Sequence, residues 1–208
     1  MTRHLATWRL LVMAVLPVLV ANICYAISAA AGHIPLCFTY VDGCTSISST
    51  GRHGTGYWLF KAAMLPQAAL LFLFWRSLNA PSITPTRHIN VARRAGMLGA
   101  AFLVIYVVTL GADTPLYNIM RRYGVFVYFI GTFAAMVSVS LWLRRRRAQH
   151  HRHWVPAALC ALMLLLGLAE IPLGKFGLAD NQAENIIEWN FALLMQGWFL
   201  ALYAALRN

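Results

Sequence analysis

Four charged side chains interrupt stretches of sequence that are otherwise apolar. They are Lys61, Asp113, Glu170 and Glu188. A charge in such a stretch is costly unless it faces protein or a wet cavity, so these four are candidate site residues. Because they include both signs, together they suit a ligand that itself carries charge. We therefore expect the four to line one polar pocket.

Three further polar residues are candidates for the same pocket. Gln196 follows Glu188 by eight residues, which places both on one face of a helix. Arg121 and Arg122 could contact a phosphate, since a guanidinium forms paired hydrogen bonds with phosphate oxygens. The alternative is a structural ion pair between Lys61 and Glu188 that fixes the packing of two helices.

Residues that could catalyse a reaction are scarce, and we assign no catalytic residue. His53 with Ser46 or Ser48 and an acid could form a hydrolytic triad, but polar loops contain these residue types routinely. The histidines within residues 149–153 have no acid or cysteine beside them, so they predict no metal site. We expect no cofactor.

The four cysteines divide into two kinds. Cys37 and Cys44 lie in a polar loop, and the six residues between them allow a disulfide to close if that loop faces an oxidising exterior. Cys24 and Cys160 lie in apolar runs, where a thiol behaves as a small buried hydrophobic group. We therefore expect one disulfide, Cys37 to Cys44.

The elements that must position these residues are long apolar segments. Of the 208 residues, 60% are hydrophobic and 11% charged, a balance far from that of soluble domains. A helix needs about 20 apolar residues to cross a membrane. The chain is therefore predicted to be an all-α integral membrane protein, a single domain forming a bundle of six transmembrane helices. These helices are expected at about residues 10–31, 57–75, 95–112, 123–143, 154–171 and 185–206.

Details within these segments predict how the helices pack. The first segment could be a cleaved signal peptide, but its apolar part exceeds the usual signal length, so we expect a retained helix. Gly96 and Gly99 in the third segment predict a close approach to another helix. Trp58 and Trp75 stand near the ends of the second segment, where aromatic residues are expected at the membrane interface.

The basic residues predict the orientation in the membrane. The formal net charge is +11, and most arginines fall in alternate inter-helix segments, whereas the six acids fall in or beside the others. Basic segments stay inside, so both termini should be cytoplasmic. The run Arg144–Arg147 has no interleaved aromatics, which disfavours nucleic acid as a partner. Arginine far outnumbers lysine, which favours a GC-rich coding sequence and a bacterial cytoplasmic membrane.

Three stretches carry a resemblance to a known family. They are SISSTGRHGTGYWLF (Ser46–Phe60), YGVFVYFIGTF (Tyr123–Phe133) and ENIIEWNFALL (Glu184–Leu194). They resemble the DRAM/FRAG/SFK-type six-helix membrane proteins, which include the DRAM autophagy modulators. That group is similar to the membrane portion of the PGAP/CWH-type factors that remodel GPI-anchor lipids. The resemblance, taken with the topology, covers nearly the whole chain and implies a role at membrane lipids.

These observations together predict a function in broad terms. We expect a multi-pass membrane protein with a lipid-binding or lipid-remodelling accessory role, whose head-group site opens to the outer face. A membrane-protein partner would fit an accessory role. The alternative is a membrane-embedded acyltransferase or hydrolase that acts on a lipid head group at the outer leaflet.

Overall fold

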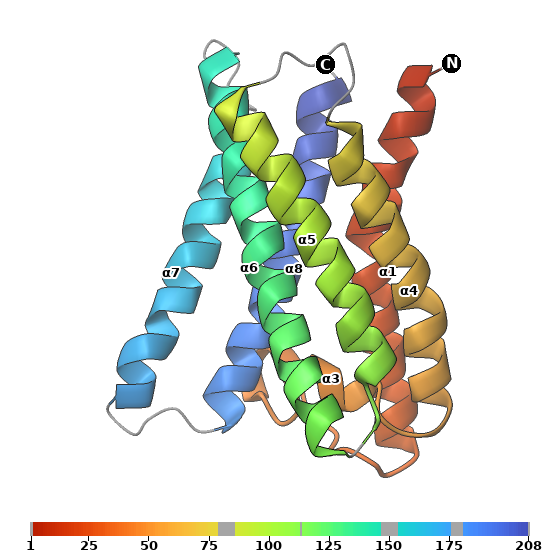
Figure 1. Ribbon diagram of the computed structural model, residues 1–208. Coiled ribbons are helices and arrows are strands. Elements are labelled where there is room, and N and C mark those ends of the chain that lie inside the picture. Colours follow the sequence, from red (N-terminus) through yellow and green to blue (C-terminus); the bar gives the residue numbers. More distant parts are fainter. Residues whose placement is uncertain (1, 79–85, 113, 147–153, 176–180, 208) are drawn as a thin grey trace.

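The computed structural model describes residues 2–78, 86–112, 114–146, 154–175 and 181–207, without the side chains of residues 2–7, 146, 170–175 and 207 (Figure 1). Over these ranges all regular secondary structure is helical. The long helices are α1 (Thr2–Ala30), α4 (Gly54–Ser77), α5 (Arg87–Thr109), α6 (Pro115–Arg146), α7 (Val155–Lys175) and α8 (Asn181–Arg207). Two short helices, α2 (Thr39–Asp42) and α3 (Ile47–Thr50), lie between α1 and α4.

The six long helices cover the six apolar segments predicted from the sequence. Five of them, α1, α4, α5, α6 and α8, are long and apolar enough to cross a membrane. The apolar stretch described in α7 is shorter and runs over Val155–Ala169. The chain is thus an all-helical protein of the multi-pass membrane class.

The long helices form a closed ring. Each packs against the next along the chain, and α8 packs against α1 to complete the circle. Successive helices run in opposite directions, so the start of α1 and the end of α8 lie at the same end of the bundle (Figure 1). The arginine-bearing ends of α4, α5 and α6 lie there too, and the segment between α1 and α4 closes the opposite end (Figure 1). The alternation of charge along the sequence therefore becomes a difference between two ends of the molecule.

Glycines bring α5 and α6 together. A Cβ atom added at Gly131 would lie 2.8 Å from the carbonyl oxygen of Ala95, and one at Gly99 would lie 2.9 Å from Oγ1 of Thr132. Such contacts leave no room for a side chain, as expected where small residues let membrane helices approach closely. The predicted role of Gly99 is confirmed, whereas Gly96 packs against the ring of Trp75 on α4 instead.

The arginine end of the bundle has an aromatic core. Trp75, Trp198 and Phe199 are each 1% exposed or less, and the rings of Trp75 and Trp198 have centroids 6.2 Å apart. The indole N–H of Trp198 donates to Oγ of Ser140 at 2.9 Å. The prediction that Trp75 lies at the membrane interface is wrong, because Gly96 opens a space on α5 into which its ring packs. Trp58, at the other end of α4, is 70% exposed as expected.

Candidate functional site

The segment Cys37–Gly56 closes the end of the bundle opposite the arginine-bearing ends of α4, α5 and α6. It is called the outer cap here because the sequence predicts that this end faces outward. Cys37 and Cys44 are joined by a disulfide across it, with 6.4 Å between their Cα atoms. Helix α2 ends at Gly43, whose φ of 60° is in the left-handed region that favours glycine. A Cβ atom at Gly43 would lie 2.1 Å from the backbone oxygen of Gln182, so the cap sits directly on the start of α8.

Side chains of α8 bind the backbone of the outer cap. Asn185 Nδ2 donates to the carbonyl of Gly43 at 2.8 Å. Trp189 Nε1 donates to the carbonyl of Thr45, also at 2.8 Å. Asn190 Nδ2 donates to the carbonyl of Tyr40 at 2.9 Å. Carbonyl groups in a loop near a membrane need such partners, because hydrocarbon supplies none.

Helix α1 holds the opposite side of the outer cap. The Tyr25 hydroxyl donates to the carbonyl of Cys37 and accepts from its N–H, both at 2.7 Å. Ser28 Oγ donates to the carbonyl of Thr50 at 2.7 Å. Asn22 Nδ2 donates to the Tyr40 hydroxyl at 2.9 Å. The cap is therefore fixed between α1 and α8.

Glu188 lies beneath the outer cap, one turn below Asn185. Its carboxylate faces the backbone N–H groups of Ile47 and Ser48, in the first turn of α3, and it interacts electrostatically with the guanidinium of Arg52. Arg52 Nη2 donates to Ser48 Oγ at 2.9 Å, and the Tyr106 hydroxyl lies beside Ser48. These residues form one polar cluster of both charge signs.

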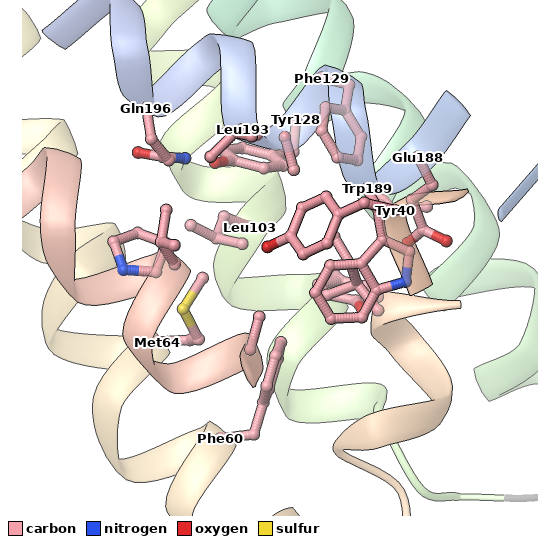
Figure 2. A pocket seen from close by; sticks show the side chains of 17 residues that line it. Tyr40, Phe60, Met64, Leu103, Tyr128, Phe129, Glu188, Trp189, Leu193 and Gln196 are labelled. Carbon is pink, nitrogen blue, oxygen red and sulfur yellow. The ribbon is translucent and has the colours of Figure 1, made fainter. Parts of the chain in front are cut away.

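An apolar cavity begins at this cluster and extends into the bundle (Figure 2). It is lined by Pro17, Val18, Ala21, Tyr40, Ile47, Phe60, Met64, Leu103, Tyr106, Val125, Tyr128, Phe129, Glu188, Trp189, Ala192, Leu193 and Gln196. Its volume of about 60 Å³ is room for about four to six water molecules, at about 10 to 15 Å³ each by the same measure. Leu193 lines the cavity and is 44% exposed, so at this point a single side chain separates the cavity from the surface of the bundle.

Glu188 and Gln196 lie at different depths of this cavity. Both line it, and Figure 2 shows them toward opposite sides of the view. They are eight residues apart on α8, which corresponds to about 12 Å along the helix axis. Gln196 is 6% exposed, and its Oε1 atom is buried without a hydrogen-bond partner. The cavity thus has a charged outer end and a polar group deeper inside.

Lys61 does not line this cavity, so its predicted place in the pocket is wrong, and the alternative ion pair with Glu188 is not found among the described side chains either. The ammonium group of Lys61 donates to the Tyr57 hydroxyl and to the carbonyl of Val108 at 3.0 Å, and it lies 4.2 Å from the centroid of the Tyr57 ring. The cause is the direction in which the Lys61 side chain leaves the axis of α4. Phe60 on that helix lines the cavity, and the next residue points about 100° away.

The other predicted residues are distributed as follows. Gln196 and Glu188 line the same cavity, as their spacing indicated. Arg122 is exposed on α6, and neither it nor Arg121 lines the cavity, although Arg121 is close enough to act electrostatically on Tyr106. Asp113 and the side chain of Glu170 lie outside the described residues.

Two residues of the site were missed from the sequence. Arg52 takes the place that Lys61 was expected to have, and Tyr106 adds a hydroxyl to the polar cluster. Arg52 stands within the Ser46–Phe60 stretch that carries the family resemblance, so that signal was available. Nothing in hydropathy distinguishes Tyr106, because it lies in an apolar helix with no neighbouring charge.

The described side chains form no recognisable catalytic or metal site. Ser46 Oγ lies 2.8 Å from Ser49 Oγ and 3.1 Å from Ser48 Oγ, and His53 packs its ring against His33 with centroids 5.2 Å apart. In the described part of the chain, no serine is hydrogen-bonded to a histidine, and no three His, Cys, Asp or Glu residues are grouped to hold a metal.

Comparison with known proteins identifies no relative. No family model matches the sequence, and neither a curated protein nor a solved structure matches the chain.

Proposed function

We propose that this chain is a six-span membrane protein that binds a lipid at its outer face, in an accessory role of the kind that its resemblance to the DRAM type implies. The observation that carries this proposal is the cavity, whose walls are mostly apolar and whose end at Glu188 and Tyr106 adjoins the guanidinium of Arg52. A lipid has the same division between apolar chain and polar head. In the proposed complex, a segment of acyl chain occupies the cavity and the head group meets Arg52 and Glu188.

The polar cluster suits a head group that contains a phosphate. A guanidinium pairs with phosphate oxygens through charge-assisted hydrogen bonds. Arg52 has a buried Nε atom without a hydrogen-bond partner, so part of its donor capacity is unused. Glu188 lies close by and would favour a cationic group on the same ligand. A zwitterionic phospholipid satisfies both requirements.

The proposed orientation follows from the charge of the two ends. The arginine-bearing end faces the cytoplasm, since positive segments are retained there, and the outer cap with its disulfide faces the oxidising exterior. In this arrangement α7 is the sixth span, both termini are cytoplasmic, and the membrane is a bacterial cytoplasmic membrane.

Mass spectrometry of lipids that co-purify in mild detergent tests the lipid proposal. Ala192 lines the cavity, so Ala192→Phe should fill it and reduce the lipid retained per protein several-fold. Ala69→Phe is the matched control, because Ala69 is an exposed alanine on α4 outside the cavity. Equal lipid retention by the wild type and Ala192→Phe would contradict the proposal.

A further inference from the structure

Gln196 is the deepest polar group that the proposed ligand would meet. Its side chain is 94% buried, it lines the cavity, and its Oε1 accepts no hydrogen bond. An acceptor that is neither solvated nor paired is unfavourable, and buried polar groups in proteins are nearly always satisfied. Any group that pairs with this atom must be a donor, because a carbonyl oxygen can only accept.

The surroundings of Gln196 restrict what that donor can be. The cavity around it is lined mainly by apolar side chains, including Met64, Leu103 and Phe129. A charged donor would be costly at this depth, whereas a hydroxyl group carries one donor and no charge. Water can supply such a donor, and an acyl chain that displaces the water leaves Oε1 unpaired unless the chain carries a hydroxyl of its own. About 12 Å of helix axis separates Gln196 from Glu188, so the donor lies well below the head group.

We infer that the lipid bound by this protein carries a hydroxyl group part-way along its chain, and that this hydroxyl donates to Oε1 of Gln196. This inference rests on the proposed function and specifies its ligand class. The chain reaches the cavity from the membrane beside Leu193, on the exposed side of the wall. Gln196 then discriminates hydroxylated from plain chains, because only the former satisfies the buried acceptor.

The test uses methionine methyl groups as local probes in the full-length protein. Met64 is 7% exposed and lines the cavity, whereas Met120 is 36% exposed on α6 and reports lipid that merely coats the protein. The protein is labelled with ¹³C-methyl methionine and titrated with two single-chain phosphocholine lipids. One carries stearate and the other carries a stearate with a mid-chain hydroxyl.

We expect the Met64 signal to shift saturably with both lipids, and at a severalfold lower concentration of the hydroxylated one. Gln196→Leu should abolish this difference while the plain lipid still binds. Gln67→Leu is the matched control, since Gln67 is also a buried glutamine with an unpaired Oε1 but does not line the cavity, and it should keep the difference.

The outcomes separate this inference from the proposed function. If both lipids shift Met64 at equal concentrations, the cavity binds lipid but Gln196 does not select a hydroxyl, and the inference is wrong. A Gln196→Leu protein that still prefers the hydroxylated lipid leads to the same conclusion. If only Met120 responds, neither lipid enters the cavity and the proposed function fails as well.

Discussion

Glu188 combines a structural contact with a position in the candidate site. Its carboxylate faces two backbone N–H groups of the outer cap and the guanidinium of Arg52, and it also lines the cavity. A side chain with only a structural task would not need to face open space. One that only bound ligand would not need two backbone donors. The residue therefore connects the outer cap to the wall of the cavity.

Replacing Glu188 by Gln should lower the free energy of unfolding by about 2 kcal/mol. The amide offers one acceptor oxygen in place of two and no charge toward Arg52, and hydrogen bonds to charged groups contribute about 1.5–3 kcal/mol. Thermal unfolding in detergent measures the effect. Glu184→Gln is the control, because Glu184 is exposed on the same helix and should change stability by no more than about 0.5 kcal/mol. Equal effects of the two changes would show that Glu188 makes no special contact.

The disulfide between Cys37 and Cys44 also contributes to the stability of the outer cap. Closing a loop of this length in the unfolded chain is expected to stabilise the protein by about 2.5 kcal/mol. Changing both Cys37 and Cys44 to Ser should lower the free energy of unfolding by about the same amount. Reductant should add the mass of two hydrogen atoms to the wild type and leave the mass of the double variant unchanged. Both thiols free in protein made in an oxidising compartment would refute the bond.

At the scale of elements, the length of the apolar segments predicted where the helices lie in the sequence. It did not predict which side of each helix faces the interior of the bundle. Each long helix could be located because a membrane span needs a run of apolar residues. Which residues of such a run face the interior depends on the helices that pack around it. A helix that is apolar on all sides has no distinct apolar face from which its orientation could be predicted. Lys61 was misplaced for this reason. Trp75 was misplaced because its burial depends on Gly96 of another helix.

The spacing of polar residues predicted the inward face of a helix better than apolar length did. Glu188 and Gln196 were expected on one face of α8, and the structure places both on the cavity. The outer cap itself could not be built from the sequence, because it depends on contacts of α8 side chains with a loop more than a hundred residues away. Arg52 became part of the site through that docking.

The docking of the outer cap on α8 gives a prediction with an internal control. Gly43 and Gly32 both have positive φ, of 60° and 73°, so an alanine at either position costs about 1 to 2 kcal/mol in backbone strain. A Cβ atom at Gly32 meets nothing within 4 Å, whereas one at Gly43 overlaps the backbone of Gln182. Overlap in a packed region adds about 1 to 3 kcal/mol.

Gly43→Ala should therefore destabilise the protein by about 3 kcal/mol or more, and Gly32→Ala by clearly less. Thermal unfolding of the two variants under the same conditions decides this. If they unfold at the same temperature, the outer cap does not rest on the start of α8.

At the scale of the whole molecule, the two ends of the bundle differ in charge and in construction. One end carries the arginines at the ends of α4, α5 and α6 and an aromatic core, and the other carries the outer cap with its hydrogen bonds to α1 and α8. A closed ring of antiparallel helices keeps these ends apart across its full length (Figure 1). The candidate site lies at the capped end, so the orientation of the bundle decides which leaflet supplies the ligand.

Cysteine labelling tests that orientation and can use the native protein as its background. Cys24 and Cys160 are buried, and Cys37 and Cys44 are bonded to each other, so a membrane-impermeant maleimide should not label the unmodified chain in intact cells. Ser77 lies at the arginine end of α4 and Asn181 at the capped end of α8, and both are exposed. We expect Asn181→Cys to be labelled from outside and Ser77→Cys only after the membrane is permeabilised, because arginine-bearing segments are retained in the cytoplasm. If only Ser77→Cys is labelled in intact cells, the proposed orientation is wrong and the site faces the inner leaflet. If both variants are labelled, the helices do not form a membrane-spanning bundle.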